Sequence, residues 1–257
     1  MRAPILTLTT DFGLSGHYVG SMKGVILGIC PVTLIVDISH QVSPYAIAEG
    51  AFLIAQAYRT FPRGTVHVVV VDPGVGSERR PILMEAAGQY FVAPDNGVLG
   101  MILAREKHKV RVISNPRYFR QPVSQTFHGR DIFAPAGAHI ASGVRLSCFG
   151  KVIADYVRPS FAEPRQTGPD AWAGEILTVD RFGNVVTNFP ADDFPRFAEL
   201  AIGGANVGRL VHSYAEAPEG ELVVIAGSSG YLEVSLNQGS AAGKIGCRAG
   251  DPCHIRI

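Results

Sequence analysis

Residues 65–74 read Thr-Val-His-Val-Val-Val-Val-Asp-Pro-Gly, an apolar run that ends at an acidic turn. A continuous apolar run of this length predicts a strand that is covered on both faces, as in a parallel sheet. Asp72-Pro73-Gly74 supplies the turn residues that end it. We therefore expect an α/β fold around this segment, with a ligand crevice where such strands end.

The segments around this strand alternate between strand and helix patterns. Residues 1–158 therefore predict an α/β domain with a largely parallel sheet. Its other expected elements are strands at 5–10 and 33–38, helices at 18–29, 46–58, 97–105 and 132–142, and a hairpin formed by 82–86 and 90–93.

The pattern changes after this domain. Prolines and scattered charges predict a linker over residues 159–170. Beyond it, short strands recur between turn residues, which predicts a smaller all-β, barrel-like domain over residues 171–257. Its strands are expected at 175–179, 185–187, 200–202, 208–210, 222–226, 231–235 and 253–257.

Composition limits the kinds of partner. The chain has 257 residues, of which 47% are hydrophobic and 18% charged, with a formal net charge of +1. A near-neutral chain favours neither nucleic acid nor an anionic membrane, so we expect a small-molecule partner. The first ten residues do not resemble a signal peptide and no long apolar segment occurs, so a cytoplasmic location is expected.

The four cysteines form no Cys-x-x-Cys pair. A zinc site built from Cys247, Cys253 and His254 is conceivable, but free thiols in a reducing compartment fit the spacing better.

Two loops of the first domain follow expected strands and carry carboxylates. Asp11 follows the first strand, where a carboxylate can accept hydrogen bonds from both hydroxyls of a ribose, or can simply stabilise a turn. Asp72 is followed by a glycine-rich segment that contains Arg79, and the two could pair across the crevice or form an ordinary surface ion pair.

Two further loops carry groups suited to chemistry or recognition. His128 precedes Gly-Arg-Asp at a loop-to-helix junction, and its side chain titrates near neutral pH, although Asp131 could serve only as a helix cap. Asn184 lies in an Asx-rich turn and could read an adenine edge, or could belong to an ordinary hairpin.

A metal-dependent hydrolase is the alternative that these residues leave open. Carboxylates and imidazoles are the ligands of two-metal sites, but no recognisable ligand motif such as His-x-His occurs. The candidate ligands are Asp11, Asp37, His40, Asp72, Asp95 and His128.

Taken together, the loop segments resemble one family, the S-adenosyl-L-methionine (SAM) hydroxide adenosyltransferases, or SAM hydrolases, which are related to fluorinase and chlorinase. The resemblance extends over nearly the whole chain and keeps the order of the motifs. The matching segments are 10–13, 22–24, 43–45, 49–51, 71–76, 93–97, 126–131, 180–184 and 237–241.

The resemblance implies an α/β domain followed by a β-barrel, in a homotrimer. It also implies SAM sites at subunit interfaces, between the first domain of one chain and the second domain of the next. SAM would be the substrate, and no separate cofactor or metal is expected.

The same resemblance implies a role for individual residues. In the first domain, Asp11 would hold the ribose hydroxyls, with Tyr45 and Phe127 as aromatic walls. In the second, Asn184 would read adenine, Asp180 and Ser228 would hold the methionine amino and carboxylate groups, and Asn237 would also contact the substrate.

The hydrolase branch is marked by an acid, an arginine and a histidine around a water molecule. These match Asp72, Arg79 and His128, with Arg80 as the alternative arginine. Relatives carry an acid near Gly16 that helps to bind the amino group, and this chain has none there. Fluorinase-like members carry Arg at the position of Ser229 and lack the acid at Asp72, so both differences favour water over halide. We therefore expect hydrolysis of SAM to adenosine and L-methionine, with a SAM- or adenosine-binding sensor as the alternative.

Overall fold

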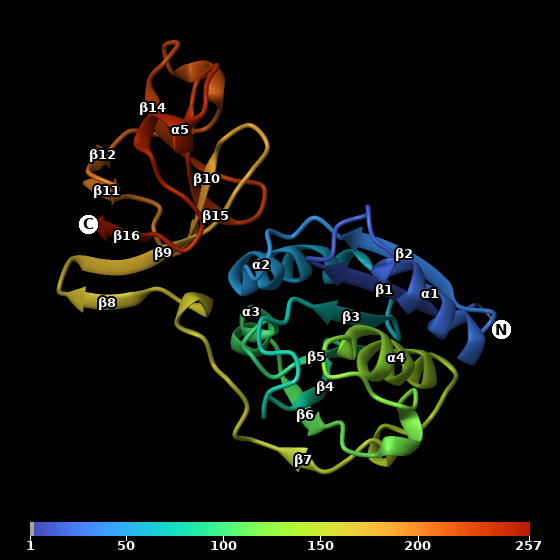
Figure 1. Ribbon diagram of the computed structural model, residues 1–257. Helices are drawn as coiled ribbons and strands as arrows, with labels where there is room; N and C mark the ends of the chain where they lie inside the picture. The colour runs from blue at the N-terminus through green and yellow to red at the C-terminus, as the bar shows by residue number, and fades with distance from the viewer. Residues whose placement is uncertain (1–2) are drawn as a thin grey trace. The chain divides into compact units, whose positions relative to one another are not determined.

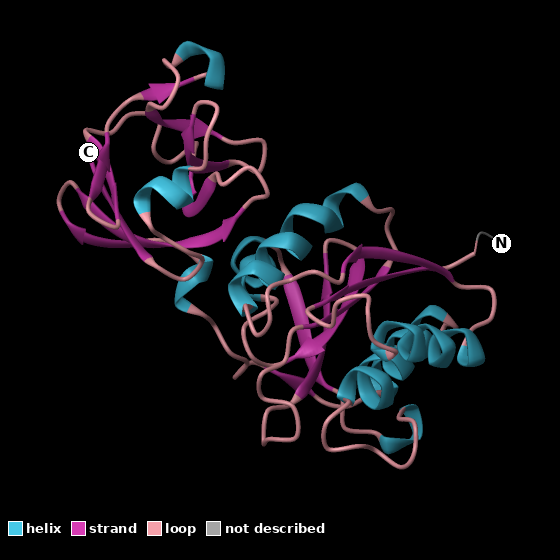
Figure 2. Cartoon of the chain, turned by 45° about the horizontal axis from the view of Figure 1, so that its top comes forward, coloured by secondary structure: helices cyan, strands magenta, loops and turns pink. Residues whose placement is uncertain are grey.

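The computed structural model describes residues 3–257. The chain forms two compact units, Met1–Pro159 and Ser160–Ile257. Figure 1 shows helices on both faces of a sheet in the first unit, and Figure 2 shows that strands dominate the second.

The first unit contains a seven-stranded sheet in the order β2-β1-β3-β5-β4-β6-β7. The pairs β1–β2, β1–β3 and β3–β5 are parallel, and the pairs from β5 outward through β4 and β6 to β7 are antiparallel. The α/β prediction is confirmed, although strand β6 and the edge strand β7 were not expected. The strands are β1 Ile5–Thr10, β2 Leu34–Ser39, β3 Val66–Val70, β4 Pro81–Ala86, β5 Gln89–Pro94, β6 His108–Val112 and β7 Val152–Ile153, and the helices are α1 Tyr18–Ile29, α2 Ile47–Ala57, α3 Gly100–Arg105 and α4 Ala134–Ala141.

Strand β3 is buried along its whole length, as its uninterrupted apolar sequence predicts. Alternate residues point to opposite faces of a strand. Val68 packs toward α4, where a Cβ on Gly137 would lie only 2.6 Å from its Cγ2. Val71 packs toward α2, where a Cβ on Gly50 would lie 2.8 Å from its Cγ2. Helices therefore cover both faces of the central strand.

The order of the strands places the candidate site. From β1 the chain passes through α1 to β2 on one side of β1, and then through α2 to β3 on the other side. The carboxyl ends of β1 and β3 therefore meet where the strand order reverses, which is where open α/β sheets bind ligands. Asp11 directly follows β1, and Asp72 follows β3 after one residue.

The second unit is one strongly curled, open sheet in the order β12-β11-β16-β9-β10-β15-β14-β13, with β8 paired to β9. Its pairs are antiparallel apart from β13–β14. The domain that the sequence predicts to be barrel-like is thus a half-barrel. Its elements are β8 Arg165–Gly168, β9 Ala171–Val179, β10 Val185–Pro190, β11 Glu199–Ile202, β12 Ala205–Val207, β13 Leu210–Val211, β14 Leu222–Ala226, β15 Tyr231–Leu236, α5 Ala241–Ile245 and β16 Pro252–Arg256.

Two details differ from the sequence expectation. The strand expected at residues 208–210 is displaced, because only Leu210 lies in a strand, β13, while Gly208 and Arg209 separate β13 from β12. A Cβ at Gly208 would lie 2.7 Å from the carbonyl oxygen of Ala198, so the chain passes close to that backbone at this point. Helix α5 was also not expected in an all-β domain, and β8 lies within the segment expected as a linker.

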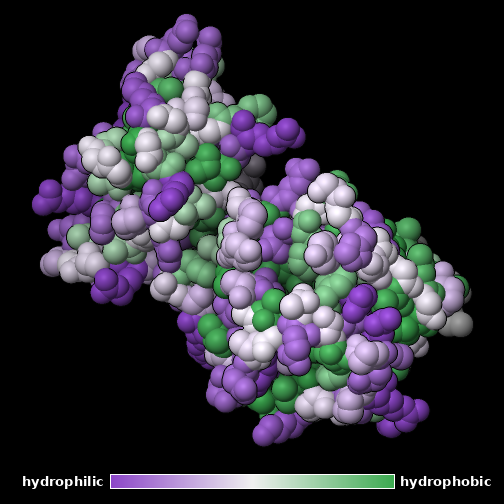
Figure 3. Space-filling view, viewed as in Figure 1, coloured by the Kyte–Doolittle hydropathy of each residue, from purple (hydrophilic) through white to green (hydrophobic). Residues whose placement is uncertain are grey.

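Hydrophilic side chains cover much of the visible face of each unit, with hydrophobic ones between them (Figure 3). Two large exposed aromatic side chains, Tyr45 at 71% and Phe182 at 81% exposure, lie beside the cavities described below. Within residues 3–257, every helix is too short or too polar to span a membrane.

Candidate active site

The first unit contains a cavity of about 370 Å³ at the carboxyl ends of β1 and β3. It combines carboxylates, one imidazole and aromatic walls. The residues that line it are Asp11, Phe12, Tyr18, Pro44, Tyr45, Val70, Asp72, Val75, Thr126, Phe127, His128 and Gly129.

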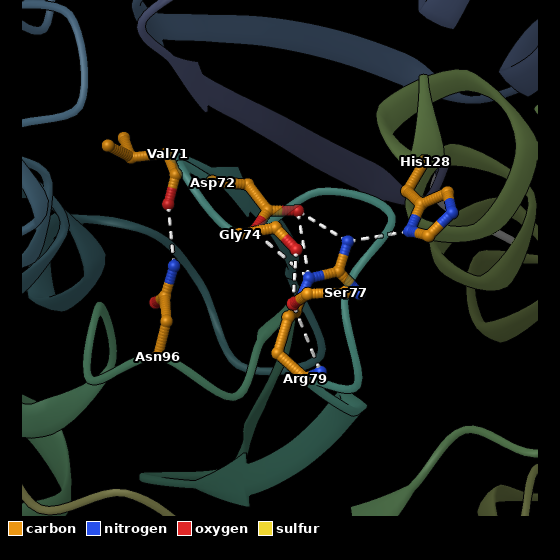
Figure 4. A network of polar contacts seen from close by, with 7 residues as sticks. All are labelled: Val71, Asp72, Gly74, Ser77, Arg79, Asn96 and His128. Carbon is orange, nitrogen blue, oxygen red and sulfur yellow. Dashed lines mark hydrogen bonds and ion pairs between the residues drawn. The ribbon is translucent and has the colours of Figure 1, made fainter. Parts of the chain in front are cut away.

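Asp72, Arg79 and His128 form a continuous polar chain beside this cavity (Figure 4). Nε of Arg79 donates to both carboxylate oxygens of Asp72, at 3.0 Å each, and Nη2 donates to Oδ2 as well. Nη2 also lies 2.6 Å from Nδ1 of His128. The side chains of Asp72 and Arg79 are only 4% and 9% exposed, so the ion pair is largely shielded from water.

Contacts to the backbone of the β3–β4 loop hold the polar chain of Asp72, Arg79 and His128 in place. Asn96 donates from Nδ2 to the carbonyl of Val71 over 2.8 Å, immediately before Asp72. Gly76 has φ +79°, and a Cβ there would lie 2.5 Å from the carbonyl oxygen of Gln125. A side chain at Gly76 would therefore displace the loop that carries Arg79.

The contact with Arg79 fixes the tautomer of His128. Guanidinium is only a donor, so Nδ1 must present its lone pair and the neutral ring carries its proton on Nε2. Burial lowers the pKa of His128 from its ordinary 6.5, and the charge of Arg79 lowers it further. His128 is thus a neutral hydrogen-bond donor at neutral pH, at the start of a π-helical turn, Gly129–Phe133, that leads into α4.

Asp11 is oriented by an unusual backbone at Tyr45. Oδ2 of Asp11 accepts a hydrogen bond from the backbone N–H of Tyr45 over 3.0 Å. Tyr45 has φ +68°, a left-handed conformation that is uncommon for an aromatic residue and is found most often at functional sites. Burial raises the pKa of Asp11, and the nearby charge of Asp72 contributes to the same effect.

Four aromatic residues are among those that line this cavity, and the resemblance had named Tyr45 and Phe127 but not Phe12 or Tyr18. The Phe127 ring packs edge-on against Tyr18 and Phe12, with centroids 4.9 and 5.9 Å apart. Tyr18 begins α1, and its 42% exposure could not be deduced from its place in a helix pattern. Aromatic rings therefore line the same cavity as the carboxylates of Asp11 and Asp72.

The structure separates the two adjacent arginines. Arg80 turns away from His128 and pairs with Asp95 at 2.7 Å and with Asp155 at 3.0 Å. Arg79 is therefore the arginine of the candidate site.

The metal-ligand candidates do not form one cluster. Asp37 pairs with Lys23 at 2.6 Å and lies 3.0 Å from His40, while Asp95 pairs with Arg80. No three His, Cys, Asp or Glu side chains within residues 3–257 are placed to hold a metal ion. Cys253 points into the core of the second unit, whereas its neighbour His254 is exposed on the opposite face of β16.

Asp131 does not cap a helix. Its carboxylate is fully buried and accepts hydrogen bonds from Arg130 and from the backbone N–H of Ser124. These contacts hold the turn that follows His128.

The second unit has its own cavity, of about 770 Å³. Oδ1 of Asp180 accepts hydrogen bonds from the backbone N–H groups of Phe182 and Asn184, at 2.8 and 2.9 Å. Its Oδ2 accepts from Nδ2 of Asn184 at 2.9 Å, and Oδ1 of Asn184 accepts no hydrogen bond from the described residues 3–257. The residues that line this cavity are Asp180, Phe182, Asn184, Tyr214, Ile225, Ala226, Gly227, Ser228, Glu233, Leu236, Gln238 and Gly239.

Three residues that the family resemblance assigns to the substrate line this cavity, namely Asp180, Asn184 and Ser228. Asn237 is not part of its lining, and its Nδ2 donates to the carbonyl of Ala217 over 2.6 Å. Tyr214 and Glu233 were missed, although a glutamate inside the apolar strand β15 is a signal that could have been noticed.

In a comparison with known proteins, both units match domains of the same family. Residues 6–150 match the SAM hydroxide adenosyltransferase N-terminal domain, and residues 174–254 match the SAM hydroxide adenosyltransferase C-terminal domain.

Individual relatives cover nearly the whole chain. An (R)-S-adenosyl-L-methionine hydrolase from Salinispora tropica is 36% identical over 98% of this chain and 97% of its own length. A fluorinase from Nocardia brasiliensis is 27% identical over 100% and 98% of the two chains. The crystal structure of an uncharacterized conserved protein from Thermotoga maritima superposes with a TM-score of 0.85 at 37% identity, covering 98% of this chain and 100% of that one.

Proposed function

Since the chain belongs to the SAM hydroxide adenosyltransferase family, we propose that it hydrolyses SAM to adenosine and L-methionine. Hydrolase relatives at about 35% identity over nearly the full length support this assignment. The single observation that carries the mechanism is the buried chain from Asp72 through Arg79 to His128 beside a cavity.

The proposed reaction is an in-line displacement at C5′ of the ribose. The water oxygen forms a bond to C5′ while the C5′–S bond breaks, and the sulfur keeps the electron pair and leaves as the thioether of methionine. The proton released by the water passes to Asp72 and then to solvent. Orientation of the nucleophile against a good leaving group lowers such barriers by up to about 7–11 kcal/mol in well-aligned cases.

Each member of the polar chain has one task in this scheme. Asp72 accepts a hydrogen bond from the water through the lone pairs that Arg79 leaves free, because each carboxylate oxygen can accept two bonds. His128 donates from Nε2 and fixes the position of the water oxygen. Arg79 holds both partners in register and stabilises hydroxide-like charge.

The remaining proposed contacts with SAM come from residues that line the two cavities. Asp11 accepts from the ribose hydroxyls, with Tyr45 and Phe127 against the sugar. Asn184 uses its free Oδ1 for the adenine amino group. In the same cavity Asp180 and Ser228 hold the amino and carboxylate groups of methionine. Asn237 lies outside the lining of this cavity, where its Nδ2 donates to the carbonyl of Ala217, so we assign it no contact with the substrate.

A carboxylate beside the nucleophile favours water over a halide ion. Two like charges repel, and the repulsion grows where water is excluded. Asp72, with a side chain 4% exposed, would therefore oppose a chloride or fluoride ion at the position that suits a neutral water molecule.

We also propose a homotrimer, in which the first unit of one chain and the second unit of the next contribute to one SAM site. The family resemblance supports this arrangement. Light scattering of the purified protein tests the trimer directly.

Product analysis tests the function. The protein is incubated with SAM and the products are separated by HPLC, with and without EDTA. Adenosine and methionine in equal amounts, unaffected by EDTA, are expected. Methylthioadenosine as the product, or loss of turnover with EDTA, would contradict the proposal, and tight binding without turnover would instead favour the sensor.

A further inference from the structure

His40 is a buried polar side chain beside the candidate site that has no part in the proposed reaction. It directly follows β2, is 4% exposed, and does not line the cavity of the first unit. A polar ring that is withdrawn from water is unfavourable unless its nitrogens meet polar partners. The partners of His40 therefore indicate what the ring does.

An irregularity in the pairing of β1 with β2 brings His40 alongside Thr10. The register shifts by one residue just before Thr9, which lies opposite Ser39, so β2 contains one extra residue at this point. Such a bulge changes the direction of the side chains around it and is common beside active sites. Nδ1 of His40 lies 2.9 Å from the hydroxyl oxygen of Thr10, the residue immediately before Asp11.

The donor in this contact can be assigned. Oγ1 of Thr10 accepts from the backbone N–H of Phe12 over 3.3 Å, and its hydroxyl hydrogen has no acceptor within residues 3–257 other than Nδ1 of His40. The hydroxyl therefore donates to Nδ1, and a ring that carries one proton holds it on Nε2. Nε2 lies 3.0 Å from Oδ1 of Asp37, an ion-pair contact rather than an aligned hydrogen bond.

Asp37 holds the other side of the ring. Its Oδ2 accepts from Nζ of Lys23 in α1 at 2.6 Å, while its Oδ1 faces His40. Burial acts to raise the pKa of Asp37, but the contacts with Lys23 and His40 outweigh it and hold that pKa below its ordinary 3.8. The carboxylate is therefore charged at neutral pH and attracts the proton on Nε2.

The backbone of His40 makes a second connection to the loop after β1. Its carbonyl oxygen accepts from the N–H of Gly13 over 2.7 Å. The loop that carries Asp11 is thus tied to His40 on both sides, through Thr10 before the carboxylate and through Gly13 after it. The carboxylate of Asp11 in turn accepts from the N–H of Tyr45, farther along the same loop as His40. Two loops that form the crevice are therefore joined through one histidine.

Building on the proposed function, we propose that His40, held by Asp37, is a positioning residue that sets the carboxylate of Asp11 for the two ribose hydroxyls. It acts through Thr10 and Gly13 rather than by touching the ligand. His40 thereby strengthens the selection of ribonucleosides over nucleosides that lack these hydroxyls.

Binding of two nucleosides to the full-length protein, measured by calorimetry, tests this role. Adenosine carries both ribose hydroxyls, and 2′,3′-dideoxyadenosine carries neither. His40→Leu should weaken the binding of adenosine by about tenfold, the order expected when a hydrogen bond to a charged group is misplaced, and should change the binding of dideoxyadenosine less than about twofold.

A conservative variant should rescue the effect. His40→Asn places an amide oxygen near the position of Nδ1, where it can still accept from Thr10, although it no longer reaches Asp37. It should therefore recover most of the affinity for adenosine that His40→Leu loses.

His67→Leu is the matched control. His67 is also fully buried, and its Nδ1 lies 2.7 Å from the hydroxyl oxygen of Thr7 on the same strand, β1. Thr7 and Thr10 point to opposite faces of that strand, so His67 lies away from Asp11. The control should lower the Tm, but it should leave the ratio of the two nucleoside affinities within about twofold of the unchanged protein.

The outcomes are distinct. An equal loss for both nucleosides in His40→Leu, or unchanged binding of adenosine, would overturn the proposal. If His40→Leu does not fold, Asp37→Asn decides, because it removes the charge that holds the ring and should weaken adenosine alone, by a smaller factor.

The unchanged protein separates this proposal from the proposed function. If it does not prefer adenosine to dideoxyadenosine, both the ribose contact of Asp11 and the positioning role of His40 are overturned. If it prefers adenosine but releases none from SAM, the proposed function fails while the positioning role remains.

Discussion

Nη2 of Arg79 lies 2.6 Å from Nδ1 of His128, while the same guanidinium holds the carboxylate of Asp72. Arginine donates in both contacts, so a single side chain fixes the orientation of an acid and the tautomer of an imidazole. Three residues separated by up to 56 positions in sequence thereby behave as one unit.

Replacing Asp72 by Asn should reduce kcat by about 100-fold or more, because the amide is a poor acceptor for the proton of the attacking water. Binding of adenosine should change little, since Asp72 contacts the nucleophile. HPLC of adenosine formed under saturating SAM measures the effect. Asp155→Asn is the matched control, because Asp155 has a side chain 77% exposed and pairs with Arg80. Equal turnover in Asp72→Asn and the unchanged protein would remove Asp72 from the mechanism.

The two adjacent arginines should differ. Arg79→Lys replaces a planar fork by a point charge that cannot hold Asp72 and His128 together, and kcat should fall by about 10-fold to 100-fold. Arg80→Lys affects a partly exposed ion-pair network and should leave kcat within about twofold. Single-turnover rates of the two variants check this, and the reverse order would assign the site to Arg80.

Activity should be lost in acid through His128. The pKa of the imidazole is lowered from 6.5, so the ring is neutral at pH 7 and becomes charged only as the pH falls below 6.5 toward the folded pKa. A protonated ring can no longer accept from Arg79. The groups that face it are Arg79, which disfavours the charge, and Asp72 and Asp131, which favour it.

The profile of kcat/KM against pH reports this ionisation in the free enzyme. We expect a plateau from about pH 7 to 8 and an acid limb whose midpoint lies below 6.5. The stability of the fold should depend on pH in the same direction. The unfolded chain binds a proton at His128 more readily than the folded protein, so the free energy of unfolding rises with pH. The contribution of His128 to this free energy is present above pH 6.5 and is lost as the pH falls below it. His128→Asn should abolish or displace the limb. A midpoint above 6.5 would contradict the assignment.

Two inactive variants should complement each other if sites form between subunits. Asp72→Ala disables the contribution of the first unit, and Asp180→Ala that of the second. In a cyclic trimer each mixed assembly restores one site of three, so equal random mixing should recover about a quarter of the activity. Mixing after mild unfolding and refolding, compared with unmixed samples treated alike, measures this. No recovery would place all contacts within one chain.

Close helix–sheet packing at Gly137 gives a stability test. An added Cβ would meet Val68 at 2.6 Å, so Gly137→Ala should lower the free energy of unfolding by about 1–3 kcal/mol. Gly20→Ala in α1, where a Cβ meets nothing within 4 Å, is the control and should be neutral or stabilising. Thermal unfolding of both variants gives the comparison.

Local patterns predicted most of the first unit. Helix α1 begins and ends at the expected residues, and β1 and β3 differ from expectation by one residue at most. Strand β6 was missed because its polar start, His108-Lys109, lacks the apolar pattern of a covered strand. Of the strand expected at residues 208–210, only Leu210 lies in a strand, and the close approach of Gly208 to the backbone of Ala198 could not be deduced from a local pattern.

The sequence by itself determined the chemistry at the strand ends: a carboxylate after β1, another after β3, and a histidine before α4, each at a turn with its own local signal. Only the tertiary structure decided which arginine joins them, that His128 is neutral with its proton on Nε2, and that His40 meets Thr10 beside Asp11. The physical reason is that periodicity fixes which way a side chain points within one element, whereas hydrogen-bond partners and desolvation depend on segments that meet only when the chain folds.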